Sequence, residues 1–324
     1  KVEMVYDELN DVNWGYIKSK MNNLQSSIRT NIMSNSNLST AQKFYSSYYP
    51  EMLKESPDKE IYDFNSPFIL NDTGKNLTIE KGGLFTCKRT QNTGFPAQFY
   101  QLVEGIPEPF VMDYFKLISA GGILPDLQTI QNHSQNLFDP TNSPVLDYLK
   151  NNRGLTDSTI KDYQIGYDGQ KQMLIFPILN ATQAGIVAMK YVEFPINKTS
   201  KKDVVIGCSI LLDYSRISKN IKNITRFLFV NDILDAIYLR QVGYDVLYNI
   251  EEETKWHPEW NKLIKGKEIL IITDDVEESI RWAIQFKGKA SKLTQVALNN
   301  SVSSFFVRSK KSTQDFEEIV KTSK

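Results

Sequence analysis

A regular alternation of strand and helix patterns in the last third of the chain most constrains its fold. Short apolar runs typical of buried strands are separated by segments with a helical spacing of apolar residues. Strands that alternate with helices in this way favour a mainly parallel sheet with helices on both faces. The expected strands are Phe227–Val230, Asp245–Tyr248, Ile269–Ile272 and Leu293–Ala297, and the expected helices are Ile233–Gln241, Trp260–Ile264 and Glu277–Phe286.

The segment Lys267–Phe286 is the central unit of this pattern. An apolar strand stops at Asp274 and Asp275, and a helix follows. In an open α/β sheet the chemistry lies at the carboxyl ends of strands, so this acidic tip is the first candidate site. The structural alternative for both aspartates is a helix cap that complements the helix dipole. The residues predicted to share one side of the helix are Ile280, Ala283, Ile284 and Phe286.

Composition and pattern divide the chain into five parts. Residues 1–60 are polar and form a helical extension that packs either on its own domain or on a partner chain. Residues 61–118 form a small β unit with helices, residues 119–143 a linker or irregular loop, residues 144–225 a second unit and residues 226–324 the parallel sheet. The helices expected outside the sheet unit are Trp14–Met33, Thr40–Leu53, Ala97–Val103, Phe110–Leu117, Val145–Lys150 and Thr156–Lys161. The other expected elements are strands at Leu77–Ile79, Leu84–Cys87, Met173–Ile178, Gly185–Val192 and Phe305–Arg308, and a closing helix at Asp315–Val320.

The totals restrict the function. With 38 basic and 38 acidic residues the formal net charge is zero, whereas a dedicated nucleic-acid binder usually carries a basic excess. The two cysteines, Cys87 and Cys208, lie too far apart for a metal motif and suggest a reducing compartment. No apolar run reaches the roughly 18–20 residues of a membrane-spanning helix. The sequence starts at Lys1 without an initiator Met, which fits either cleavage after organelle import or a trimmed sequence.

Three consecutive segments carry a family resemblance. Arg153–Tyr167 reads RGLTDSTIKDYQIGY, Met173–Ile178 reads MLIFPI, and Gly185–Lys190 follows. This order resembles the core of bacterial DnaG-type primases, and its form is most similar to the Twinkle-type mitochondrial primase–helicases and their phage relatives. The resemblance implies an α+β protein with an α/β part: a small degenerate zinc-ribbon-like β unit, and a primase core with a Toprim-like, mainly parallel sheet flanked by helices.

The upstream half of the resemblance identifies the positions of a zinc site. Ser66-Pro-Phe-Ile69 stands where the family has Cys-Pro-x-His, and Leu84–Cys87 matches the strand that supplies the other ligands; the helix Phe99–Gly105 follows the F-x-x-x-x-E-G pattern. The four ligand positions are Ser66, Ile69, Cys87 and Thr90. A structural zinc ribbon needs four Cys or His ligands, so we expect no zinc here. Apolar packing of Phe68, Ile69, Leu77 and Phe85 is expected to replace the metal, with Cys87 buried.

The downstream half identifies the positions of a Toprim metal site. That site uses a Glu at the end of one strand and Asp-x-Asp at the end of the next to hold Mg²⁺ for phosphoryl transfer. Here the Glu position is Asn231, and the Asp-x-Asp becomes Asp274-Asp275-Val276. Adjacent residues of an extended chain point to opposite sides, so two neighbouring aspartates do not replace the motif. Asp232 or Asp235 could support only a weak substitute site.

Two basic residues lie where related primases contact template or nucleotide: Lys190 and Arg226. Their structural alternative is a solvated or ion-paired surface role. The chain lacks the G-x-x-x-x-G-K-[ST] phosphate loop of a helicase motor. A second group of basic residues, Lys287, Lys289 and Lys292 with Arg308, Lys310 and Lys311, could form a patch.

Three functions follow from these observations. The first is a pseudo-enzyme without cofactors, a structural or interaction subunit of a larger mitochondrial, matrix-side assembly such as a respiratory complex, ATP synthase or mitoribosome. The second is a nucleic-acid-binding region of a Twinkle-type mitochondrial DNA helicase, with weak binding of single-stranded DNA. The third, a working primase, is disfavoured by the ligand losses. Protein subunits are therefore the expected partners.

Overall fold

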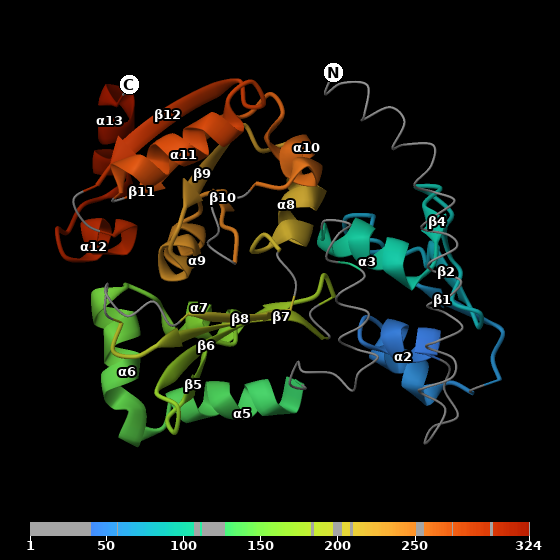
Figure 1. Ribbon diagram of the computed structural model, residues 1–324. Coiled ribbons are helices and arrows are strands. Elements are labelled where there is room, and N and C mark those ends of the chain that lie inside the picture. Colours follow the sequence, from blue (N-terminus) through green and yellow to red (C-terminus); the bar gives the residue numbers. More distant parts are fainter. Residues whose placement is uncertain are drawn as a thin grey trace.

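The computed structural model describes residues 40–56, 58–106, 111, 127–182, 185–196, 203–207, 210–250, 256–273, 275–298 and 301–323. These residues form three four-stranded sheets, each with its own helices (Figure 1). The helix expected at Trp14–Met33 lies outside the described residues, as does Phe110–Leu117 apart from Val111. No helix in the described ranges is both long enough and apolar enough to cross a membrane.

The first sheet belongs to the N-terminal unit. Strands β1 (Ile61–Phe64), β2 (Leu77–Glu80), β3 (Phe85–Cys87) and β4 (Thr93–Gly94) pair antiparallel in sequence order, which confirms the two strands expected here. Helices α2 (Thr40–Ser46) and α3 (Pro96–Glu104) and the 3-10 turn Pro50–Lys54 accompany the sheet. The ring of Phe99 is at the centre of their core, with edge contacts to Tyr45 at 5.2 Å, Tyr48 at 5.0 Å and Phe85 at 5.3 Å between centroids.

The second sheet is also antiparallel. It consists of β5 (Gly166–Asp168), β6 (Met173–Leu179), β7 (Ile186–Glu193) and β8 (Val204–Gly207), in that order. Helices α6 (Ser143–Asp147) and α7 (Asp157–Asp162) lead into it, separated by a π-helical turn at Tyr148–Asn152. The Thr156 hydroxyl accepts a hydrogen bond from Thr159 N and so caps the start of α7. The two apolar strands expected in this unit are therefore the central pair of the sheet.

The prediction of an irregular loop over residues 119–143 is wrong for its central part. Residues Leu127–Leu137 form helix α5, which lies along β5 (Figure 1). Ile130 and Leu137 are fully buried, and the fit is close because a Cβ on Gly166 would lie 2.8 Å from the Cβ of His133. The helix was not expected because its Asn- and Gln-rich sequence presents so few apolar residues.

The third sheet is parallel, as the strand–helix alternation predicts. Its order is β10 (Val246–Leu247), β9 (Arg226–Val230), β11 (Glu268–Thr273) and β12 (Lys292–Ala297). The helices of this unit are α8 (Tyr214–Asn220), α9 (Ile233–Gln241), α10 (Asn261–Ile264), α11 (Val276–Phe286), α12 (Val302–Val307) and α13 (Thr313–Thr322). Phe227, Phe229, Ile269 and Ile271 join one hydrophobic cluster, and the alternate residues Leu228, Val230, Leu270 and Ile272 join another. Both faces of the sheet are therefore buried.

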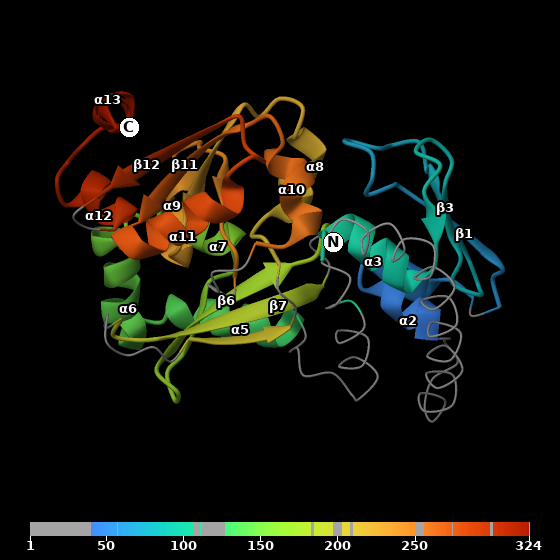
Figure 2. The same cartoon turned by 45° about the horizontal axis from the view of Figure 1, so that its top comes forward.

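Two expectations for this unit are corrected. Residues 305–307 belong to helix α12 and Arg308 is its C-cap, so the expected strand is absent there. Ser301 caps the start of that helix, and Phe306 packs against Tyr238 and Phe316. Helix α11 buries Ser279, Trp282 and Phe286, whereas Ile280 and Ile284 are 49% and 68% exposed. Figure 2 shows α11 on the outer side of β11 and β12. The rings of Trp282 and Phe286, one turn apart, set the buried face. Of the predicted apolar side, Ala283 and Phe286 pack on the core, and Ile280 and Ile284 face solvent.

The N-terminal unit contacts the parallel-sheet unit through α3. Trp260 Nε1 donates a hydrogen bond to the Gly105 carbonyl at 2.9 Å. The N-terminal unit also contacts the second sheet, where Asn180 Nδ2, just after β6, donates to the Ser47 carbonyl at 2.8 Å. Gly105 has φ +64°, and a Cβ there would lie 2.0 Å from the ring of Tyr214. Only glycine fits this position, because the backbone is left-handed and an aromatic ring occupies the side-chain space.

Candidate functional site

The carboxyl edge of the parallel sheet is the first candidate site. Strands β9 and β11 lie side by side, with Val230 opposite Ile272, so the residues that follow them meet at one edge. Asn231 follows β9, and its Nδ2 donates to Glu278 Oε2 at 2.7 Å. The other oxygen of Glu278 accepts from Trp282 Nε1 at 3.3 Å. The residue after β9 therefore presents an amide that donates to a carboxylate.

The acidic tip after β11 caps a helix. Asp275 Oδ1 accepts hydrogen bonds from Glu277 N at 2.8 Å and Glu278 N at 3.2 Å. This is the N-cap role, which satisfies free N–H groups of the first turn. Val276 is the first residue of α11 and is 65% exposed. Asp274 lies outside the described residues.

Asp232 and Asp235, the expected substitutes, are bound by a single arginine. Arg153 Nη2 lies 3.0 Å from Asp232 Oδ2, and Arg153 Nη1 lies 3.1 Å from Asp235 Oδ1. The Asp235 carboxylate also accepts from Ser303 Oγ at 2.7 Å, Ser303 N at 3.0 Å and Val302 N at 2.8 Å. Asp235 thereby caps the start of α12 from the middle of the core.

The electrostatics of this group follow from burial and pairing. Burial lowers the pKa of Arg153, but the carboxylates of Asp232 and Asp235 outweigh it and raise that pKa. Burial, with the like charge of Asp232, raises the pKa of Asp235 to about 6, although Arg153 and Ser303 oppose the shift. Asp235 is therefore a costly charge that its cation and its donors hold in place.

This donor set does not fit a magnesium site. Mg²⁺ needs oxygen ligands that are free to coordinate, usually including one or two carboxylates. Here Asn231 donates its amide nitrogen, and Asp232 and Asp235 are paired with a guanidinium. Among the residues that the structure describes, no group of three or more His, Cys, Asp or Glu side chains is arranged to hold a metal ion.

The positions of the expected zinc ligands also come together. Ser66 Oγ lies 3.2 Å from Cys87 Sγ in the buried interior of the N-terminal unit. Burial raises the pKa of the Cys87 thiol, but hydrogen bonds from Ser66 and from the hydroxyl and N–H of Thr90 outweigh it and lower the pKa. Ile69 packs against the core and offers no ligand atom. One thiol with two hydroxyls and an alkyl group does not fit zinc, which needs four thiolate or imidazole ligands.

The two basic residues of the nucleic-acid alternative are both engaged. Lys190 on β7 is buried, with Nζ 3.1 Å from Asp203 Oδ2 and 5.8 Å from the centre of the Tyr248 ring. Arg226 at the start of β9 binds Glu317 through both terminal nitrogens, one of them at 3.0 Å. Each of these cations already has an acidic partner within the chain.

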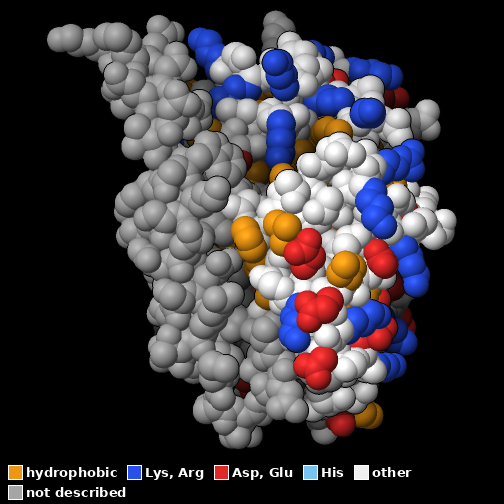
Figure 3. All heavy atoms as spheres, turned by 90° about the vertical axis from the view of Figure 1, so that its right-hand side faces the viewer, with side chains coloured by type: hydrophobic (Ala, Val, Ile, Leu, Met, Phe, Trp, Pro, Cys, Tyr) orange, Lys and Arg blue, Asp and Glu red, His pale blue; other side chains and the backbone are white. Residues whose placement is uncertain are grey.

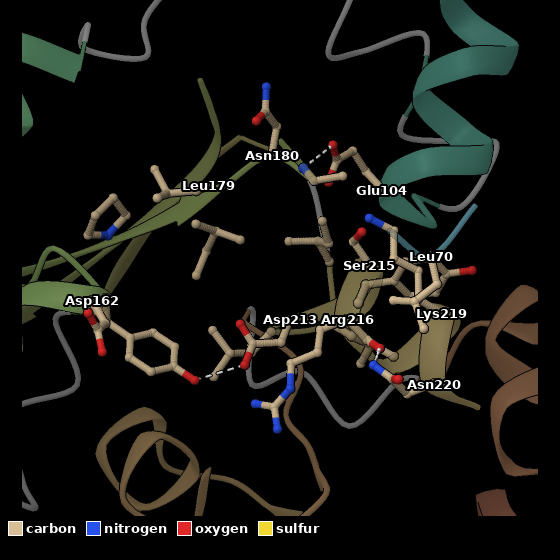
Figure 4. A pocket seen from close by; sticks show the side chains of 18 residues that line it. Leu70, Glu104, Asp162, Leu179, Asn180, Asp213, Ser215, Arg216, Lys219 and Asn220 are labelled. Atoms are coloured by element: carbon tan, nitrogen blue, oxygen red, sulfur yellow. Dashed lines mark hydrogen bonds between the residues drawn. The ribbon is translucent and has the colours of Figure 1, made fainter. Parts of the chain in front are cut away.

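A cavity of about 490 Å³ lies where α3, β6 and α8 meet (Figure 4). Its charged lining includes Glu104, Asp162, Asp213, Arg216 and Lys219. Figure 4 shows Glu104 on the α3 side, bonded to the backbone beside Asn180, with Lys219 close to it on α8. The sequence pattern of Phe99–Gly105 gives no sign of a role for its acidic residue, Glu104.

Burial determines the chemistry of Glu104. Desolvation raises the pKa of its carboxyl to about 7, while hydrogen bonds from Ala181 N (2.8 Å) and the Tyr48 hydroxyl oppose the shift. Burial also lowers the pKa of Lys219, against the attraction of Glu104. On the other wall, Tyr163 donates to Asp213 Oδ2 at 2.8 Å. The cavity therefore contains a carboxyl group that changes its charge near neutral pH.

Comparisons with known proteins give a distant likeness. No family model matches the sequence, and neither does any curated protein. The structure is similar to that of the Aquifex aeolicus primase zinc-binding and RNA polymerase domains, with a TM-score of 0.45 and 14% identity over 90% of this chain and 86% of that one. A DnaG primase catalytic domain bound to single-stranded DNA gives 0.46 and 13%, covering 60% and 79%. The RNA polymerase domain of Mycobacterium tuberculosis primase DnaG gives 0.47 and 12%, covering 60% and 81%.

Proposed function

We propose that this chain is a primase-like protein that has lost phosphoryl transfer and serves as a structural or interaction subunit of a larger mitochondrial assembly. One observation carries the proposal: Asn231 donates to Glu278 at 2.7 Å, at the edge where a Toprim-like sheet would bind metal. In place of a carboxylate that could bind metal, Asn231 presents an amide whose N–H group forms a hydrogen bond within the protein. The edge then contributes to folding instead of to catalysis.

The neighbouring acidic residues support this proposal. Phosphoryl transfer relies on metal ions and on positioned charges that stabilise the transferring group. Arg153 uses the Asp232 and Asp235 carboxylates to join residues before β5 to α9 and α12. Asp275 satisfies the first turn of α11. Each of these groups has a structural task that competes with metal binding.

In this proposal the N-terminal unit has also lost a metal site. It corresponds to a zinc-ribbon-like unit whose metal has been replaced by a core of aromatic rings. Phe68 lies 5.7 Å from both Phe85 and Phe99, beside the buried contact of Ser66 with Cys87. Packing of this kind stabilises a small sheet by burying aromatic area.

The assembly is proposed from the resemblance to Twinkle-type proteins together with the altered metal positions. A respiratory complex, ATP synthase or mitoribosome are the three candidates. The test is purification of the endogenous protein from mitochondria under native conditions, followed by separation by size. Constant stoichiometry with the subunits of one assembly supports the proposal. Recovery as a free chain, or with mitochondrial DNA alone, would contradict it.

Loss of catalysis has its own test. Primer synthesis on a defined template is measured with Mg²⁺ or Mn²⁺, beside an active primase as the positive control. We expect no primers from this chain. Primer synthesis that disappears in Asp274→Asn and persists in Asn223→Asp would overturn the proposal, because the activity would then depend on the former metal edge.

The nucleic-acid-binding alternative, a Twinkle-type helicase region, loses support at Lys190 and Arg226 because both are paired with acidic residues. A different surface of the protein favours contact with nucleic acid, at the opposite edge of the parallel sheet. Binding of nucleic acid at that surface would not require a catalytic carboxyl edge.

A further inference from the structure

Three basic segments meet at the amino edge of the parallel sheet. Residues 214–226 lead through α8 into β9, residues 261–268 lead through α10 into β11, and residues 286–293 lead from α11 into β12. The segments are bonded to one another, because Glu268 N donates to the Thr225 carbonyl at 3.0 Å and Ser291 N donates to the Lys267 carbonyl at 2.8 Å. Parallel strands place all three starts on the same side of the molecule.

The charge of these segments is one-sided. They contain four, three and three Lys or Arg residues, and their single acidic residue is Glu268. Glu268 binds Lys292 at 2.9 Å, and Arg226 is bound by Glu317 from α13. Lys267 donates to the carbonyls of Ile221 and Ile224. In a chain with zero net charge, this edge therefore concentrates positive charge.

The remaining cations, apart from Lys219 in the cavity beside Glu104, define what we call the amino-edge patch. Within the described part of the chain, none of them makes an ion pair, and all but one are exposed. Figure 3 shows Lys and Arg side chains gathered on the upper part of one face, over the region of α8 and α10, with few acidic side chains among them. The patch consists of Arg216, Lys222, Lys262, Lys265, Lys287 and Lys289.

We propose that the amino-edge patch is a docking surface for the phosphate backbone of a nucleic-acid duplex. Clustered lysines bind phosphates as point charges and release condensed counterions, a contact that requires no base sequence. The patch lies at the sheet edge opposite Asn231 and Asp275, so a bound duplex would leave the former metal edge free.

A duplex fits this surface better than a single strand. Proteins that hold single strands stack the bases on exposed aromatic rings. None of the Phe, Tyr and Trp residues in the described ranges is exposed; the exposed large apolar residues are all Leu, Ile or Val. A surface with cations and without stacking rings can contact a backbone but offers no platform for splayed bases.

An anionic membrane fits the surface less well. Membrane-surface helices combine basic residues with an apolar face that enters the lipid. No exposed large apolar residue lies in the three segments 214–226, 261–268 and 286–293. The patch therefore offers positive charge without the apolar face that a membrane-surface site needs.

The test compares a charge reversal inside the patch with one outside it. The variant Lys222→Glu/Lys265→Glu/Lys287→Glu reverses three patch residues. The matched control Lys54→Glu/Lys75→Glu/Lys321→Glu makes the same change in net charge at three exposed lysines elsewhere. Binding of the full chain to short RNA and DNA duplexes is followed by fluorescence anisotropy between about 50 and 200 mM salt, with thermal unfolding as a check that each variant folds.

We expect the wild-type and control proteins to bind duplex with an affinity that falls steeply with salt. The patch variant should bind at least about 100-fold more weakly at low salt, and its slope of log affinity against log salt should fall by about three. The RNA and DNA arms identify which duplex is preferred. A poly(dT) strand and vesicles of phosphatidylserine and phosphatidylcholine complete the set of probes.

Four outcomes would overturn the proposal: no salt-dependent duplex binding, an equal loss in both triple variants, tighter binding of poly(dT), or tighter binding of the vesicles. The measurement uses the isolated chain and does not involve the mitochondrial assembly. Failure here leaves the subunit proposal standing, and failure of the co-purification test leaves the patch proposal standing.

Discussion

Arg153 Nη1 lies 3.1 Å from Asp235 Oδ1, and this buried pair joins the segment before α7 to helix α9. The exposed fractions of the two side chains are 8% and 6%. The same guanidinium reaches Asp232, Ser303 and the Tyr148 hydroxyl, so one side chain holds together elements from three parts of the sequence. Through these contacts Asp232 and Asp235 have a structural role at the edge of the sheet.

Replacing Arg153 with Met should destabilise the protein strongly. The substitution leaves the buried Asp235 carboxylate without its cation, and breaking a buried pair from one side costs about 3–5 kcal/mol. Arg153→Lys should recover only part of this loss, because an ammonium group cannot reproduce the planar set of hydrogen bonds. The free energy of unfolding from urea denaturation checks both variants.

The matched control for Arg153 is Arg226→Met. Arg226 and Glu317 are 28% and 31% exposed, so their pair lies nearer to water and should contribute about 1 kcal/mol or less. Equal losses in Arg153→Met and Arg226→Met would contradict a special structural role for the Arg153 group.

Replacing Asn231 with Asp should create a divalent-ion response, whereas we expect none from the natural chain. The new carboxylate would lie beside that of Glu278, and two like charges at this distance raise the pKa of the pair and cost roughly 1–2 kcal/mol near pH 8. The stability of the variant should fall as pH rises through the raised pKa, and Mg²⁺ should restore it. Thermal unfolding with and without Mg²⁺ gives the measurement.

The exposed Asn223 provides the control for this experiment. Asn223→Asp adds the same charge away from Glu278, so its unfolding temperature should remain independent of Mg²⁺. An equally large Mg²⁺ response in the natural chain would show that the carboxyl edge already binds the ion, and the proposed loss of the metal site would be wrong.

Zinc chelation should leave the natural protein folded. Cys87 has Ser66 and Thr90 as its polar neighbours, and these do not bind zinc in place of thiolates or imidazoles. Treatment with a strong zinc chelator should therefore not change the unfolding temperature. By contrast, Cys87→Ala removes a buried hydrogen-bonding group and should cost about 1–2 kcal/mol. A fall in unfolding temperature with release of one zinc per chain would contradict the expectation.

The parallel-sheet unit was predictable because its signals are local. Ile269–Ile272 is apolar at every position, and helix caps such as Asp275 and Ser312 follow their usual side-chain chemistry. Helix α5 could not be predicted in this way, because its Asn- and Gln-rich sequence has few apolar residues. Its buried residues Ile130 and Leu137 form a recognisable face only once the helix packs against β5. The exposed Ile280 and Ile284 show the same limit, because the rings of Trp282 and Phe286 decided which face was buried.

The sequence predicted where the candidate site lies on the sheet, but not which residues form hydrogen bonds and ion pairs with it. The resemblance located Asn231 and Asp275 at one edge of the sheet. The partners of that edge come from distant sequence: Glu278 lies 47 residues from Asn231, and Arg153 lies 82 residues from Asp235. The cavity at Glu104 depends on the docking of α3 against two other units, which no local pattern encodes.

The buried carboxyl of Glu104 should make the stability of the protein depend on pH. Burial raises its pKa from about 4.5 to about 7, so between these values the folded chain binds a proton that the unfolded chain has lost. The free energy of unfolding should therefore fall as pH rises through this window, by at most about 3 kcal/mol, and stay level above it. The stabilisation that comes from the protonated Glu104 carboxyl is fully present below pH 4.5 and is lost above pH 7.

Glu104→Gln isolates this contribution. The amide oxygen can still accept the hydrogen bond from Ala181 N, and the side chain no longer ionises. The difference in unfolding free energy between variant and natural chain, measured from about pH 5 to 8, should grow in favour of the variant as pH rises. Glu80→Gln, at an exposed position on β2, should keep the natural pH profile. If the Glu104→Gln profile also matches the natural one, Glu104 does not hold its proton near neutral pH, and the junction between α3 and the loop after β6 is insensitive to pH in this range.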